Sequence, residues 1–158
     1  MVVLSFGMLS YTALQSASIK YGKMAQFRTS ATQLATDFAD RLRANSDAAA
    51  AGNYDYQAAY AELTSPIALP TCAVAVCTAA EVAAIDLAQW RNAARIALPG
   101  GSLFAEIDAT APIALVVDLW VLWLDPEVHG ADEIGFGCPA DIGNAISGPR
   151  CMHFRLAL

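Results

Sequence analysis

The chain has 158 residues, of which 56% are hydrophobic, and its formal net charge is −6 at pH 7. This length is sufficient for one domain with a packed core. The acidic balance and the lack of a clustered basic patch argue against a nucleic-acid-binding protein, because binding to phosphates needs concentrated positive charge.

The first part of the chain predicts one long helix. No proline occurs between Val2 and Ala44, and the composition there is compatible with a helix of about 43 residues, or roughly 65 Å. Asn45 and Ser46 are expected to end it. In its second half, apolar residues recur every three or four positions, which predicts a stripe that packs on a sheet. The members of this stripe are Met24, Phe27, Ala31, Leu34, Phe38 and Leu42.

The length of this helix predicts that part of it protrudes. A compact domain of this size is roughly 40 Å across, so the whole helix cannot lie against it. We expect residues 1–23 to protrude as an apolar segment and residues 24–158 to form a globular head. A membrane span needs about 20 mostly apolar residues, and Met1–Leu9 supply about half of them. Exposed apolar surface aggregates in water, so this segment is expected to be buried in lipid or against other helices.

The middle of the chain predicts a loop and then a second helix. Pro66 and Pro70 exclude a long regular element in the loop. The stretch TAAEVAAIDLAQWRNAARIAL then predicts a helix over 78–98. Thr78 and Glu81 have the spacing of an N-terminal capping box, and Pro99-Gly100-Gly101 is expected to end the helix.

The remainder predicts three strands. SLFAEID alternates weakly, whereas PIALVVDLWVLWLD and RCMHFRLAL alternate well. In the last strand, Met152, Phe154, Leu156 and Leu158 are expected to face inward. The predicted fold is α+β, with a long N-terminal helix packed on a small antiparallel sheet and a second, short helix.

The four cysteines predict disulfides. Cys72 and Cys77 are close in sequence, and Cys138 and Cys151 flank a glycine-rich stretch. An even count with a membrane-like start favours disulfides formed outside the cytosol. Three connectivities are possible, and we favour the nearest-neighbour pairs. Zinc binding is the weaker alternative, because the spacings match no zinc-ribbon pattern.

No catalytic or metal site is evident, so we expect neither an enzyme nor a cofactor. The two histidines, His129 and His153, lack an identifiable orienting partner and no G-x-S-x-G motif occurs. The acidic stretch 125–133 lacks the regular spacing of a calcium loop. Asp118 interrupts an apolar strand. It is expected to face solvent on the outer side of the sheet, and a contact with a neighbouring subunit is the alternative.

Several stretches together resemble a known family. The first helix, above all VVLSFGML, ALQ and DFADRLRAN, resembles that of type IV pilus minor pilins of the PilV kind. The stretch CTAAEVAAIDLAQWRNAARIALPGG and a final strand that begins with a cysteine, RCMHFRLAL, are also similar to such proteins. The resemblance implies a pilin-like fold and a role in pilus assembly, in a priming complex near the fibre tip.

The resemblance also implies partners, location and packing residues. The partners would be other minor pilins and the major pilin, with the head in the periplasm and the helix in the bacterial inner membrane before assembly. On assembly the helix would move from lipid into a bundle of like helices, which depends on close packing at small residues. The residues implied in this packing are Val3, Leu4, Phe6, Gly7, Leu9, Ala13 and Leu14.

The start of the chain departs from the pattern of this family. Its members carry a Gly-Phe processing site followed by a glutamate, upstream of the position that matches Met1, so we expect an N-terminally truncated form. A minor pseudopilin of a type II secretion system is an alternative within the same class. A membrane-tethered periplasmic enzyme, which a deep polar pocket would favour, and an adhesin head with an aromatic groove are alternatives of other classes.

Overall fold

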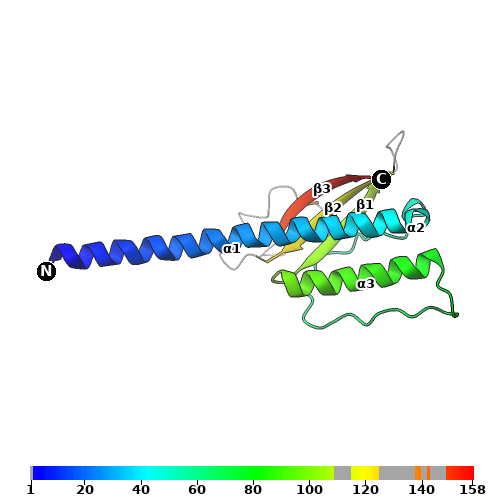
Figure 1. Cartoon of the computed structure of the whole chain (residues 1–158), viewed down its shortest axis with the longest axis horizontal. Coiled ribbons are helices and arrows are strands. Elements are labelled where there is room, and N and C mark those ends of the chain that lie inside the picture. Colours follow the sequence, from blue (N-terminus) through cyan, green and yellow to red (C-terminus); the bar gives the residue numbers. More distant parts are fainter. Residues whose placement is uncertain (1, 109–114, 125–137, 140–141, 143–148) are drawn as a thin grey trace.

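Six elements build the structure, a computed structural model that describes residues 2–108, 115–124, 138–139, 142 and 149–158. The side chains of residues 2–7 and 9 are not described. The elements are α1 (Val2–Ala44), α2 (Ser46–Ala50), α3 (Ala79–Ala97), β1 (Ser102–Asp108), β2 (Val116–Trp123) and β3 (Arg150–Ala157). Figure 1 shows α1 extending well beyond the other elements at its N-terminal end. The predicted α+β class is confirmed.

The long helix runs without interruption for 43 residues, as the absence of proline predicted. It ends at Ala44. After Asn45 the chain forms the short helix α2, which the sequence did not indicate. The helical part of the chain ends before Gly52, whose φ of 83° is a left-handed conformation suited to glycine.

The second helix begins and ends as its sequence predicts. The Thr78 side chain accepts a hydrogen bond from the backbone N–H of Glu81, and the Glu81 carboxylate accepts one from the N–H of Thr78, so the capping box is complete. At the other end, Gly100 adopts a φ of 57°, and a Cβ on Gly101 would collide with the carbonyl oxygen of Ala94. The Gly100-Gly101 pair therefore permits the tight turn into β1.

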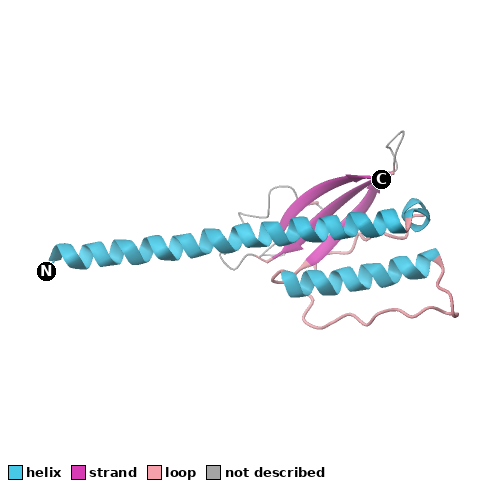
Figure 2. Ribbon diagram, in the orientation of Figure 1, coloured by secondary structure: helices cyan, strands magenta, loops and turns pink. Residues whose placement is uncertain are grey.

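The three strands form an antiparallel sheet in the order β1-β2-β3. Cys151 lies opposite Leu122 and Arg155 opposite Asp118, with no break in register along β3. Side chains alternate as predicted, so that Val117, Leu119 and Val121 lie in the core beneath the helices. Figure 2 shows α1 lying across the sheet, with α3 beside α1.

The core lies between the helices and the inner face of the sheet. Its largest members are Trp90 from α3, Phe38 from α1 and Tyr54 from the segment after α2. The ring centroid of Phe38 lies 5.7 Å from that of Trp90 and 6.0 Å from that of Tyr54, in edge-to-face geometry. Three elements distant in sequence thus meet at one aromatic cluster.

The connecting segment between α2 and α3, residues 57–77, is held along the head by polar contacts. Just before it, Tyr56 exchanges two backbone hydrogen bonds with Ala105 of β1. Further along, the side-chain amide of Asn92 binds both the N–H and the C=O of Ile67, at 2.8 and 2.9 Å. These bonds satisfy backbone groups that a long irregular segment otherwise leaves to water.

The outer face of the sheet carries a second, smaller apolar cluster. Phe104, Leu122 and Ile142 are buried there, and the half-buried Trp120 and Tyr60 pack against them. The Tyr60 hydroxyl donates to the carbonyl of Gly100 at 2.8 Å. Burial raises the pKa of Tyr60 from 10.0 to about 12, because the phenolate would lose its hydration.

Candidate functional site

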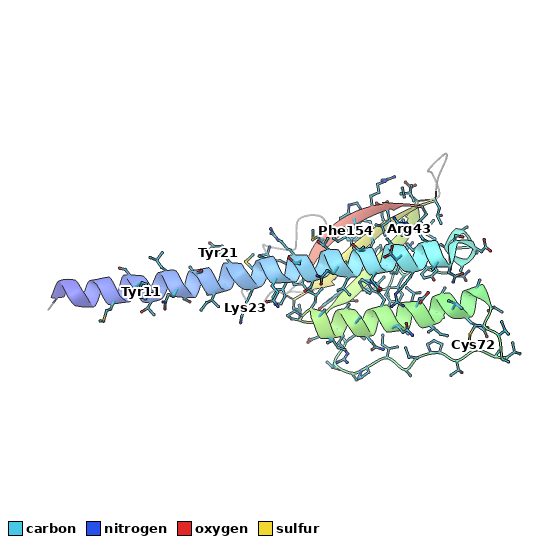
Figure 3. All side chains as sticks on the ribbon, in the orientation of Figure 1. Tyr11, Tyr21, Lys23, Arg43, Cys72 and Phe154 are labelled. Atoms are coloured by element: carbon cyan, nitrogen blue, oxygen red, sulfur yellow. A yellow bond between two sulfur atoms is a disulfide. The ribbon has the colours of Figure 1, made fainter. Side chains whose placement is uncertain are left out.

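The N-terminal part of α1 extends beyond the head, and its side chains are exposed in the described structure. In residues 8–22, which we call the exposed segment, every described side chain is exposed except the half-buried Ala17. Large apolar and aromatic residues are among them, with exposed fractions of 72% for Met8, 71% for Leu14 and 72% for Tyr21. Figure 3 shows Tyr11 and Tyr21 projecting from a part of α1 that no other described helix or strand flanks.

The residues assigned to helix packing all lie in this part of the molecule. Ala13 and Leu14 are exposed on α1. The other five, whose side chains are not described, lie in the first turns of the same helix: Val3, Leu4, Phe6, Gly7 and Leu9. Their packing against other helices stays a prediction.

A hydroxyl group in the exposed segment already has a hydrogen-bond partner within the helix. Thr12 Oγ1 donates to the carbonyl of Met8 at 2.9 Å. Such a bond removes the desolvation cost that an unpaired hydroxyl would impose in lipid or in a helix bundle. The side chain is therefore compatible with an apolar environment.

The C-terminal part of α1, residues 31–45, is packed into the head, and we call it the clamped segment. The indole nitrogen of Trp90 donates to the Leu34 carbonyl at 2.8 Å, in a buried contact. Ala31, Ala35 and Ala39 are also buried in this segment.

Charged groups also join the clamped segment to α3. Arg41 contacts Asp37 and Asp86, each at 2.9 Å, with less than a third of the Arg41 and Asp86 side chains exposed. The Tyr54 hydroxyl donates to the other oxygen of Asp86 at 2.6 Å, and Asn45 donates to Tyr54 at 3.2 Å. Burial and this bond to a carboxylate raise the pKa of Tyr54 from 10.0 to about 12.

The predicted stripe on the first helix lies partly in this clamped segment. Leu34, Phe38 and Leu42 are buried, and Phe27 is half-buried against the same cluster. Met24 is half-buried at the point where α1 enters the head. Sequence reasoning missed Asp86 and Tyr54, because a single polar residue in a helix or loop carries no signal of a partner far away in the chain.

The four cysteines form two disulfides, Cys72–Cys77 and Cys138–Cys151. The first closes a short loop in the connecting segment, at the end of the head opposite the exposed segment, where Figure 3 labels Cys72. The second joins the start of β3 to residue 138 on the outer face of the sheet, beside the second apolar cluster. Each therefore restrains one end of the head.

Asp118 is satisfied within the chain. It lies on the outer face of the sheet, where its carboxylate contacts His153 Nε2 at 2.8 Å and Arg155 at 3.7 Å. The His153 ring stacks on Trp120 with 4.5 Å between ring centroids. The outward position of the Asp118 side chain agrees with the expectation from the sequence. His129 and the acidic stretch 125–133 lie outside the described residues.

Comparison with known protein families gives a match over part of the chain. Residues 13–88 match the family model described as Tt1218-like, type IV pilin Tt1218. The match supports a type IV pilin family. The matched range contains most of the exposed segment, all of the clamped segment and the first half of α3. No curated protein and no solved structure gives a significant match.

The type IV pilin family is a family of structural subunits, which is consistent with the arrangement described above. In the described part of the chain, no group of three or more His, Cys, Asp or Glu side chains could hold a metal ion. Among the described helices, none combines the length and hydropathy that crossing a membrane requires.

Proposed function

We propose that this protein is a minor pilin that takes part in type IV pilus assembly by inserting the exposed segment of α1 into a bundle of like helices. Residues 1–23 would enter lipid before assembly and the helical core of the fibre afterwards. Residues 24–158 would remain outside as the head, first in the periplasm and then on the fibre near its tip. The partners would be other minor pilins and the major pilin.

The observation that carries this proposal is the contrast in exposure along one helix. Leu14 and Ile19 are 71% and 63% exposed, although a protein in water gains free energy by burying such side chains. The clamped segment of the same helix joins the exposed segment to the head. A partner that covers the exposed segment therefore also determines the position of the head. The match to a type IV pilin over residues 13–88 supports the same interpretation.

The main experiment replaces one apolar residue of the exposed segment by a charged one. In the native host, Leu14→Glu is expected to reduce surface pili to the level of a strain without the gene, because a carboxylate in lipid or in a helix bundle is costly. The purified full chain should keep its unfolding temperature, since the Leu14 side chain is 71% exposed.

The matched control is Ala93→Glu, at an exposed position on α3, which should leave piliation unchanged. Normal piliation in the Leu14→Glu strain would contradict the proposal. Normal piliation but defective protein secretion in the strain without the gene would instead favour a pseudopilin.

A further inference from the structure

The two edges of the sheet differ in how their backbone groups are satisfied. On β1, Ala105 exchanges both backbone hydrogen bonds with Tyr56, so the centre of that edge is covered by the same chain. On the other side of the sheet, β3 is the last strand in the described part of the molecule. The difference makes the β3 edge the candidate for a contact with another chain.

The register identifies which groups of β3 point away from the sheet. The N–H of Leu158 donates to the carbonyl of Leu115, and hydrogen-bonded pairs recur at every second residue of an antiparallel ladder. Even-numbered residues of β3 therefore bond to β2. The odd-numbered residues direct their N–H and C=O groups to the edge, and these are Cys151, His153, Arg155 and Ala157.

Three features leave this edge suitable for strand addition. The strand is eight residues long and contains neither proline nor a bulge, the features that commonly protect an edge. The inner-face residues Met152, Phe154 and Leu156 stay half-buried although they pack on the core. A neighbouring strand would cover their remaining apolar surface, and its carbonyl groups would accept hydrogen bonds from the outward N–H groups.

We propose that the β3 edge binds an extended strand of a neighbouring pilin-type subunit and so continues the sheet from one head into the next. The chemistry of the occupant follows from the edge: a peptide in extended conformation, with apolar residues at alternate positions on the α1 side and polar residues on the other. Because α1 packs against β3 as well as β2, a subunit docked along α1 lies close to this edge. The identity of the partner as a pilin-type subunit rests on the proposed function.

The test distinguishes the contribution of one outward N–H group to strand binding from the contribution of the side chain on the same residue. Proline is tolerated at an edge position whose N–H faces away from the sheet. His153→Pro therefore removes an outward donor and spares the bonds to β2, whereas His153→Ala loses the same side-chain contacts but keeps the donor. Arg155→Pro and Arg155→Ala repeat the comparison at a second outward position. Thermal unfolding of each purified head checks that it is folded.

The readout is photo-crosslinking in the native host with the full chain. A photoreactive amino acid replaces Ala157, whose side chain is exposed at the end of β3. The adducts are expected to join Ala157 to a strand of a pilin-type subunit. Their yield should fall about fivefold or more in the proline variants relative to the alanine variants, because one edge hydrogen bond is lost.

A second crosslinking position, Leu14, distinguishes this inference from the proposed function. Adducts from Leu14 to pilin subunits without adducts from Ala157 would overturn strand addition and leave the proposed function standing. Equal yields in the proline and alanine variants, or adducts within the same chain, would also overturn it. Absence of adducts from Leu14 to pilin subunits would contradict the proposed function itself.

Discussion

The two segments of α1 show how one continuous helix serves two environments. In the clamped segment, Phe38 and Leu42 are fully buried and Arg41 has two acidic partners. In the exposed segment, side chains of similar size and polarity remain in solvent in the described structure, such as Tyr11, which is 62% exposed. Helix formation is the same in both, so the difference lies in the partners. The head supplies them for one segment, and we propose that other subunits supply them for the other.

The largest expected difference in stability between the two segments comes from removing one aromatic ring from each. Phe38→Ala should lower the free energy of unfolding by about 3–5 kcal/mol, because it leaves a cavity between Trp90 and Tyr54. Tyr11→Ala should change it by less than about 0.5 kcal/mol, since the side chain is exposed. Urea denaturation of the two variants measures both values. A loss at Tyr11 as large as that at Phe38 would mean that the head covers the exposed segment.

A smaller effect is expected from the charged contacts that hold the clamped segment. Asp86→Ala leaves the Tyr54 hydroxyl without its acceptor and Arg41 with one partner fewer, and should cost about 1–3 kcal/mol. The control is Asp40→Ala, which removes an exposed ion pair between Asp40 and Arg43, both on α1. This change should cost less than about 0.5 kcal/mol. Equal losses, measured by urea denaturation, would show that Asp86 does not fix α3 to α1.

Alkaline pH offers a third way to weaken the clamped segment. The pKa of Tyr54 is raised from 10.0 to about 12 in the folded state, so the folded protein retains this proton after the unfolded chain has lost it. The resulting stabilisation is complete below pH 10 and is lost as the pH rises through about 12. Unfolding temperatures measured between pH 9 and 12 should fall more steeply for the wild type than for Tyr54→Phe. Parallel curves would contradict the raised pKa.

The smallest effect on global stability is expected at Gly22, the last residue of the exposed segment. A Cβ there would meet nothing within 4 Å, and alanine favours helix over glycine by about 0.8–1.0 kcal/mol. Gly22→Ala should therefore increase amide-exchange protection in residues 8–22. The free energy of unfolding of the head should change by less than about 0.5 kcal/mol, because opening of the exposed segment is separate from global unfolding. Unchanged protection would show that another contact limits this segment.

Local patterns accounted for most of the elements. The absence of proline gave the extent of α1, the Thr78 and Glu81 spacing gave the start of α3, and period-two alternation gave the inner faces of the strands. The turn of α2 was missed, because a five-residue helix has almost no periodic signal.

The candidate site was predictable only in part. The length and composition of α1 indicated that its apolar part protrudes, since that argument needs no knowledge of tertiary contacts. The pairing of Tyr54 with Asp86, and of Asn92 with Ile67, was not predictable, because each joins residues at least 25 positions apart. The position of β3 at one edge of the described sheet, and the groups that it directs outward, required the hydrogen-bond register, which alternation alone does not give.

The unbroken course of α1 has a mechanical consequence. A tensile force applied to its N-terminal end would be carried along the helix axis directly into the head. There it would load the bond from Trp90 to the Leu34 carbonyl and the ion pair of Arg41 with Asp86 in shear, because both bridge α1 and α3 side by side. These two contacts would share the load instead of breaking one after the other.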